Sequence, residues 1–164
     1  MRLGRPTRIS LVATVVALLA GPLLAAGSPK KEVPTNPAET WFNAGVELMK
    51  RGDWSGAVEK LGQAVTLKED YAEAHSNLGF ALRRQGARHY DNALAHYDRA
   101  IELDPELAEA YHYRGVLHAL AGDEAAAKAD HGALVDLDRE LADELMEVIA
   151  SGEEPGGRDG VVWK

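Results

Sequence analysis

The sequence contains no cysteine, which excludes disulfide frameworks, cysteine-ligated zinc, iron–sulfur clusters and thiol nucleophiles. It also lacks an excess of basic residues, since 18 Lys and Arg stand against 26 Asp and Glu and the formal net charge is −8. Because the phosphate backbone of nucleic acids attracts a basic surface, this balance argues against a nucleic-acid partner. Apolar residues make up 46% and charged residues 27% of the 164 positions, which is typical of one globular domain.

Motifs for catalysis are also absent from the sequence. No serine lies in the G-x-S-x-G context of a nucleophile elbow, and the glycines recur at regular distances instead of forming a phosphate-binding loop. The six histidines include no pair at the i, i+4 spacing that places two imidazoles on one helical face. We therefore expect no enzymatic activity, no catalytic residues, no cofactor, no metal site and no small-molecule substrate.

A single long apolar run is present, close to the N-terminus. A basic head without acidic residues precedes an apolar core over residues 9–20, a Gly-Pro helix breaker and a run of small residues. This order predicts a secretory signal peptide over residues 1–26, cleaved after Ala26 or, as a second choice, after Gly27. The protein is then expected to be exported, to the periplasm or out of the cell.

The same segment has an alternative interpretation as an uncleaved membrane anchor. No charged residue lies between Ile9 and Pro29, and these 21 positions are long enough to span a bilayer. The strongly apolar core is only 12 residues long, which favours the signal peptide. In the anchor interpretation the protein stays at the inner membrane, and only then is the membrane a partner.

Two segments of low periodicity flank the central part of the chain. Residues 27–37 are rich in proline and are predicted to form an extended linker. Residues 151–164 are rich in glycine and are predicted to be a disordered tail, ending in Val161-Val162-Trp163-Lys164, whose role the sequence leaves open. The folded domain is therefore expected over residues 38–150.

A repeat of 34 residues organises this domain. Small residues recur at distances of 34 and 36 in three sets, which are Gly45, Gly79 and Gly115; Gly52, Gly86 and Gly122; and Ala57, Ala93 and Ala127. From the second glycine to the alanine there are 5, 7 and 5 residues, so the middle unit carries a two-residue insertion after Gly86. Apolar residues at spacings of three and four predict two helices per unit, with a turn at the second glycine.

With these features the sequence resembles the tetratricopeptide repeat family, whose pattern is W-x2-L-G-x2-Y…A-x3-F…P. The first unit has Trp41, Gly45, Leu48, Ala57 and Leu61. The second has His75, Leu78, Gly79, Leu82, Ala93, Tyr97 and Pro105. The third keeps Tyr111, Gly115, Ala127 and Leu137, but otherwise apolar positions hold Arg114, His118 and His131. The resemblance implies repeats over residues 38–71, 72–107 and 108–141.

An amphipathic segment over residues 138–150 follows the third unit. Its apolar stripe consists of Leu137, Leu141, Leu145, Val148 and Ile149. It resembles the solubilising helix that closes such arrays, because the last repeat would otherwise expose its apolar side. The resemblance therefore implies an all-α fold: a right-handed α-solenoid of three helix pairs with a C-terminal capping helix.

Members of this family bind peptides or partner proteins on the concave face, which the first helix of each pair lines. The resemblance places a partner-binding groove at Phe42, Asn43, Val46, Met49, Asn77, Phe80, Arg83, His112 and Val116. Apolar side chains predominate in this set, which suits a peptide or helix with apolar anchors. We therefore expect a protein or peptide partner.

The family's best-known ligand is not expected to bind here. Co-chaperone members hold acidic C-terminal peptides with lysines, asparagines and an arginine, and only the asparagines are matched, by Asn43 and Asn77. The remaining positions are occupied by Phe42, Glu109, His112 and Tyr113. A groove without these cations is a poor site for an acidic C-terminus.

Basic residues cluster at the inserted turn, where Arg84, Arg88 and His89 follow Arg83. One interpretation is that Arg83 and Arg84 complement the dipole at the C-terminus of a helix. The other is a secondary surface that contacts an anion, since the insertion makes this turn the irregular feature of the array. By contrast, residues 102–154 hold 15 acidic and three basic residues.

These observations lead to two hypotheses about function. The first is a non-enzymatic adaptor of the cell envelope that binds a peptide or partner protein in its concave groove. The alternative is a membrane-anchored assembly factor or scaffold for an envelope complex.

Overall fold

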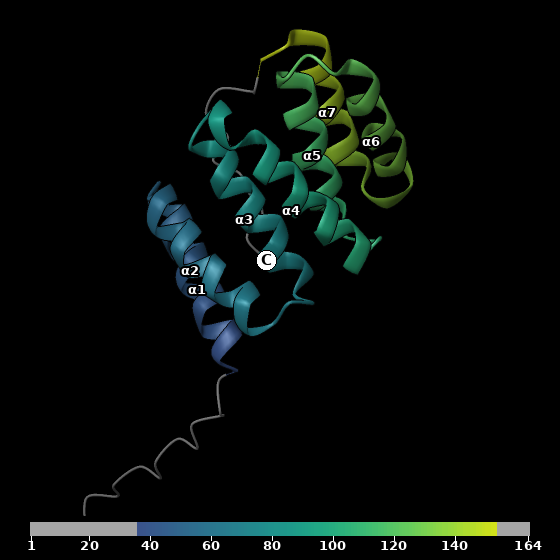
Figure 1. Cartoon of the computed structure of the whole chain (residues 1–164). Coiled ribbons are helices and arrows are strands. Elements are labelled where there is room, and N and C mark those ends of the chain that lie inside the picture. The colour runs from purple at the N-terminus through teal and green to yellow at the C-terminus, as the bar shows by residue number, and fades with distance from the viewer. Residues whose placement is uncertain (1–35, 154–164) are drawn as a thin grey trace, which may run out of the picture. The chain divides into compact units, whose positions relative to one another are not determined.

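The computed structural model describes residues 36–153. The predicted signal peptide or anchor, residues 27–35 of the predicted linker and residues 154–164 of the predicted tail lie outside the described residues. Within the described range the chain forms only helices, which confirms the all-α prediction (Figure 1). None of the helices in this range is long and apolar enough to cross a membrane.

Six of the seven described α-helices form three sequential pairs. The pairs are α1 (Pro37–Lys50) with α2 (Trp54–Leu67), α3 (Ala72–Arg84) with α4 (Tyr90–Leu103), and α5 (Ala108–Leu120) with α6 (Glu124–Leu137). The seventh, α7 (Arg139–Ser151), packs on both α5 and α6. Each pair falls within one predicted repeat, and Figure 1 shows the second helix of each pair leading into the next unit.

The ends of the folded domain differ slightly from the prediction. Helix α1 begins at Pro37, which the prediction assigned to the linker. The side chain of Asn36 accepts a hydrogen bond from the amide of Ala38, and proline is favoured at the first helical position because its missing N–H needs no partner there. At the other end, α7 includes Ser151, one residue past the predicted boundary.

The predicted turns lie at the second set of glycines. The φ angles of Gly52, Gly86 and Gly122 are 73°, 104° and 84°, in the left-handed region that glycine adopts without a steric penalty. After Gly52 and Gly122 an aspartate caps the next helix: Asp53 accepts from the amide of Gly56, and Asp123 from that of Ala126. In the middle unit the two extra residues are accommodated by a 3-10 helix, Ala87–His89.

The first set of glycines allows paired helices to approach closely. A methyl group at Gly79 would lie 2.8 Å from Cε1 of Tyr97 and 3.0 Å from the carbonyl oxygen of Ala93, which are too close for real contacts. The glycine that recurs at the repeat distance therefore reflects the packing of α3 on α4, because small residues are needed where two helix axes come near.

We expect Ala93→Leu to destabilise the protein by about 1–3 kcal/mol, because Ala93 is fully buried and a larger side chain overpacks the contact between α3 and α4. Denaturant unfolding measures the change, and Ala95→Leu on the exposed face of α4 is the matched control. An unchanged midpoint for Ala93→Leu would show that the repeat register is wrong.

The buried side chains form two clusters that meet at α5. The larger cluster joins α1 to α5 and contains Met49, Leu61, Leu78, Phe80, Tyr97, Tyr113 and Leu117. The smaller one joins α5, α6 and α7 and contains Val116, Leu134, Ala142, Leu145 and Val148. The third repeat therefore has α7 as its outer neighbour, the place predicted for a capping helix.

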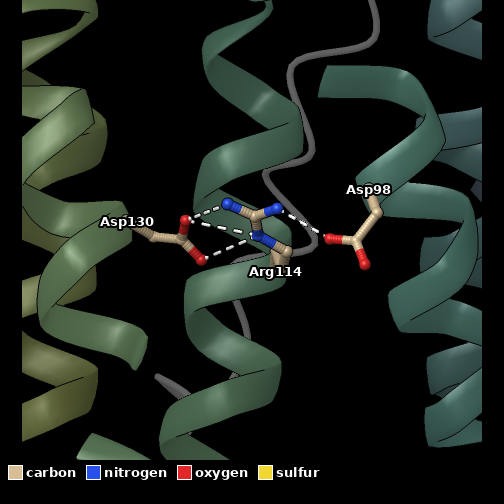
Figure 2. A network of polar contacts seen from close by, with 3 residues as sticks. All are labelled: Asp98, Arg114 and Asp130. Atoms are coloured by element: carbon tan, nitrogen blue, oxygen red, sulfur yellow. Dashed lines mark hydrogen bonds and ion pairs between the residues drawn. The ribbon is translucent and has the colours of Figure 1, made fainter. Parts of the chain in front are cut away.

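A largely buried ion pair joins α5 and α6 of the third repeat, and its arginine also reaches an exposed aspartate on α4 of the second repeat (Figure 2). Arg114 on α5 donates from Nη2 to Oδ1 of Asp130 over 2.6 Å and from Nε to Oδ2 over 3.1 Å. Its Nη1 donates to Oδ1 of Asp98 on α4 over 2.7 Å. Asp130 on α6 is only 3% exposed, so the guanidinium supplies the hydrogen bonds that its carboxylate cannot obtain from water. This pairing explains why an arginine occupies an otherwise apolar position of the repeat.

Candidate partner-binding groove

A groove of about 550 Å³ lies along α1, α3 and the start of α5. Its lining residues are Phe42, Asn43, Val46, Glu47, Lys50, Tyr71, Glu73, Ser76, Asn77, Leu107, Glu109 and Tyr113. The first helices of the three repeats therefore supply the lining, in the way that the resemblance implied. This volume is in the range of ligand-binding clefts in proteins.

Aromatic and aliphatic side chains form the apolar part of the groove. The rings of Phe42 and Tyr71 lie with their centroids 5.0 Å apart. Tyr71 and Leu107 immediately precede α3 and α5, where neither makes a side-chain capping hydrogen bond. Their side chains line the groove instead, and together with Val46 they can receive an apolar anchor.

Polar groups accompany this apolar surface. Oγ of Ser76 is buried and has no hydrogen-bond partner in the described part of the chain. Leaving a buried hydroxyl without a partner costs free energy, so a ligand that supplies one is favoured. Asn77, the next residue on α3, and Asn43 on α1 also belong to the lining and supply amide groups.

Two tyrosines of the groove lining, Tyr71 and Tyr113, have raised pKa values. Burial raises the pKa of the Tyr71 phenol, and the nearby charges of Glu73 and Glu39 raise it further. Burial is also the main cause that raises the pKa of Tyr113, with contributions from Tyr97 and from the carboxylates of Glu109 and Glu144 that exceed the opposing effect of Arg83. Both phenols therefore stay neutral and can act as hydrogen-bond donors.

Four of the predicted groove residues line this cavity: Phe42, Asn43, Val46 and Asn77. His112 is half-buried, with Nε2 3.8 Å from Oε2 of Glu144, and does not line it. The other four are buried and support the groove without lining it; they are Met49, Phe80, Arg83 and Val116.

The contacts of Phe80 show why these four side chains are buried instead of lining the groove. Its ring centroid lies 4.9 Å from that of Tyr113 and 5.9 Å from that of Trp54. Helix α3 packs against α2, α4 and α5, so ten of its residues are buried, including positions that face a groove in an isolated repeat. Phe80 is therefore a core side chain, which corrects its placement in the predicted partner-binding groove.

Some lining residues were absent from the predicted set. Tyr71 and Leu107 precede the first helix of their repeats and lie 36 residues apart, the distance found between Gly79 and Gly115. The repeat period marks them as equivalent positions, a signal that a search restricted to the helices does not use. Glu47 and Lys50 were also missed; they lie one turn apart on α1 and form an ion pair of 2.8 Å.

The side chains of the predicted anion-contact turn contact neighbouring residues of this chain. The guanidinium of Arg84 lies 4.9 Å from the ring centroid of Trp54. Nε of Arg88 donates to Nε2 of His89 over 2.9 Å. Binding of an anion at this turn stays a prediction.

Two histidines on paired helices, His75 on α3 and His96 on α4, are hydrogen-bonded to each other. Nδ1 of His75 lies 3.0 Å from Nδ1 of His96, and Nε2 of His75 lies 3.1 Å from the carbonyl oxygen of Glu69. Since a carbonyl can only accept, His75 carries its proton on Nε2 and accepts at Nδ1 from His96. Burial lowers the pKa of both imidazoles, that of His96 to about 4. No group of three potential metal ligands occurs within residues 36–153.

A family model described as "TPR repeat" matches residues 45–86 and 89–122. Among solved structures, the chain is similar to the "TPR2B-domain:pHsp70-complex of yeast Sti1", with a TM-score of 0.64, 24% identity, and coverage of 71% of this chain and 95% of that one. It is also similar to the "First TPR of Spaghetti (RPAP3) bound to HSP90 peptide SRMEEVD", with a TM-score of 0.63, 19% identity, and coverage of 71% and 95%.

A third solved structure is "YrrB: a TPR protein with an unusual peptide-binding site", with a TM-score of 0.62, 26% identity, and coverage of 70% of this chain and 59% of that one. Among curated proteins, the chain resembles "Photosystem I assembly protein Ycf3" of Cyanophora paradoxa, 26% identical over 97 residues, which are 58% of this chain and 56% of the relative. The same protein of Synechococcus elongatus is 29% identical over 97 residues, 56% of each chain. The chain thus spans about half the length of these curated relatives.

Proposed function

The chain belongs to the tetratricopeptide repeat family, and from this premise we propose that it is an adaptor that binds a peptide segment of a partner protein in the groove between α1, α3 and the start of α5. Domains of this family are protein- and peptide-binding modules. The observation that carries the proposal is the unpaired, buried hydroxyl of Ser76 beside an apolar groove lining.

The groove suggests how a peptide segment binds. An apolar side chain of the peptide packs against Phe42, Val46 and Tyr71, removing its surface from water. The amides of Asn43 and Asn77 hydrogen-bond to the peptide backbone, which carries donors and acceptors at every residue. The hydroxyl of Ser76 then gains the partner that it lacks.

We expect the double variant Asn43→Ala/Asn77→Ala to weaken peptide binding about tenfold while the melting temperature stays unchanged. Each lost hydrogen bond is worth about 0.5–1.5 kcal/mol, and 1.4 kcal/mol corresponds to a factor of ten. Neither side chain is buried, so folding does not depend on it. The probe is the tightest binder selected from a randomised 12-residue peptide library (roughly the length of an extended segment that spans three helices), measured by calorimetry.

The matched control for this measurement is Asn92→Ala, which removes the same side chain from the exposed face of α4. It should leave the affinity as it is in the parent protein. If the affinity of the selected peptide falls equally in the double variant and in Asn92→Ala, or falls in neither, the binding surface lies elsewhere.

The proposal includes export to the cell envelope. It is supported by the basic head, apolar core and small-residue exit at the N-terminus, which is the order of a secretory signal peptide. Mass measurement of the protein from its native host tests this part: a mature chain that begins at Gly27 or Ser28 in a soluble envelope fraction is the expected result.

A second candidate function is a membrane-anchored assembly factor or scaffold. Its support is the likeness to relatives described as photosystem I assembly proteins, together with an N-terminal run long enough to span a bilayer. Full-length protein in the membrane fraction, co-purifying in fixed ratio with the subunits of one complex, would favour this function over the exported adaptor.

A further inference from the structure

Three glutamates occupy equivalent positions in the three repeats. Glu39, Glu73 and Glu109 are separated by 34 and 36 residues, which are the repeat distances, and each lies in the first turn of α1, α3 or α5. Acidic residues are favourable at any helix N-terminus. These three differ from ordinary first-turn acids because they stand at the first helices, which line the groove, and Glu73 and Glu109 belong to the lining itself.

The charges along the groove do not balance. Lys50 is the cation among the lining residues, and its Nζ lies 2.8 Å from Oε1 of Glu47, so this pair is neutral. Glu73 and Glu109 form no ion pair within residues 36–153. Arg83, on the same helix as Glu73, is only 5% exposed and lies 5.0 Å from the ring centroid of Phe80, outside the lining. The lining therefore carries two carboxylates that form no ion pair within the described residues, and a cation outside the lining, Lys68, lies over the ring of Tyr71, with Nζ 4.4 Å from its centroid.

A second, independent observation marks the same place as a ligand site. Ser76 lies one helical turn after Glu73, it is 2% exposed, and its hydroxyl lacks a partner in the described part of the chain. A buried hydroxyl beside unpaired carboxylates and apolar rings is complementary to a segment that has hydrogen-bonding groups, an apolar anchor and positive charge.

We propose that the groove takes a peptide segment in which Lys or Arg residues flank an apolar anchor, and that the carboxylates of Glu73 and Glu109 hold the cationic side chains. This inference rests on the proposed peptide-binding function and adds the charge of the ligand. Its polarity is opposite to that of the peptide SRMEEVD found on one structural neighbour, which has two glutamates and an aspartate near its end.

The test uses two synthetic 12-residue peptides that share the same leucine and phenylalanine anchors and differ in their flanking residues, four lysines in one and four glutamates in the other. Their affinities for the protein are measured by fluorescence anisotropy at low and high salt. We expect the lysine peptide to bind at least about tenfold more tightly at low salt, and the difference to shrink as salt screens the charges.

Charge-removing variants locate the effect. Glu73→Gln/Glu109→Gln keeps the shape of both side chains and should weaken binding of the lysine peptide about three- to tenfold. Glu102→Gln on α4, which removes one exposed carboxylate away from the groove, is the control and should change the affinity by less than about twofold.

Other results would contradict either the inferred ligand charge or the proposed peptide-binding function. If both peptides bind equally, or the glutamate peptide binds better, the charge inference is wrong and the groove function stands. If the lysine peptide binds better but Glu102→Gln weakens it as much as Glu73→Gln/Glu109→Gln does, the attraction comes from the general acidity of the protein and the inference fails. If neither peptide binds, the proposed function itself fails.

Discussion

Ending the chain after Asp138, which removes α7, is expected to abolish cooperative unfolding of the third repeat and to cause association of the protein. Leu145 and Val148 of α7 are 0% and 1% exposed, and they cover Val116 and Leu134 on α5 and α6. Fully burying one such side chain stabilises a protein by about 1.5–3 kcal/mol. Removing both side chains also exposes the apolar surfaces that they cover, and the combined loss exceeds the free energy of unfolding that one repeat of a small array contributes.

Calorimetry and size-exclusion chromatography measure this effect. The matched control ends after Glu153, which keeps all of α7 and removes only residues outside the described range, and its melting temperature should equal that of the full chain. If the chain that ends at Asp138 stays monomeric and melts at the parental temperature, α7 is not a cap and the third repeat is stable without it.

Arg114→Ala is expected to destabilise the protein by about 3–5 kcal/mol, because it leaves the carboxylate of Asp130 buried without its partner. The alternative, that Asp130 recruits water and the loss is small, is disfavoured by its 3% exposure. The free energy of unfolding, measured in denaturant, decides between them.

Two further variants separate the ion pair from ordinary loss of side-chain contacts. Lys128→Ala removes an exposed cation from its pair with Glu124, where a surface ion pair contributes only about 0–1 kcal/mol. The double variant Arg114→Leu/Asp130→Leu removes both charges and should recover most of the stability lost in Arg114→Ala, because no unpaired buried charge remains; Asp98 is left in contact with water. Equal losses in Arg114→Ala and Lys128→Ala would show that the buried pair has no structural role.

The proposed function and the inferred ligand charge are testable independently of these stability measurements. The substitutions at Asn43, Asn77, Glu73 and Glu109 all lie on side chains that are exposed or half-buried, so they leave the core unchanged. The stability variants, by contrast, act on buried contacts between helices. A loss of binding in the first group with an unchanged melting temperature therefore reports on the groove alone.

The sequence alone determined the architecture, because the constraints that form it are local and recur with every unit. A glycine is required where α3 approaches Tyr97, another where the chain turns with φ of 104° at Gly86, and aspartates cap the helices that follow Gly52 and Gly122. Each requirement recurs at the repeat distance, so the period, the helix pairs and the insertion in the middle unit are all visible without a structure.

Only the tertiary structure decided which side chains of the first helices are available to a ligand. The repeat period places Val46 and Phe80 at equivalent positions, 34 residues apart, but Val46 lines the groove whereas Phe80 is buried against Trp54 and Tyr113, because α3 has a neighbouring repeat on both sides. The same holds for the partner of Arg114 and for the hydrogen bond between His75 and His96, which join residues 16 and 21 positions apart on different helices. A sequence period specifies what each unit looks like, whereas exposure and pairing depend on how the units stack.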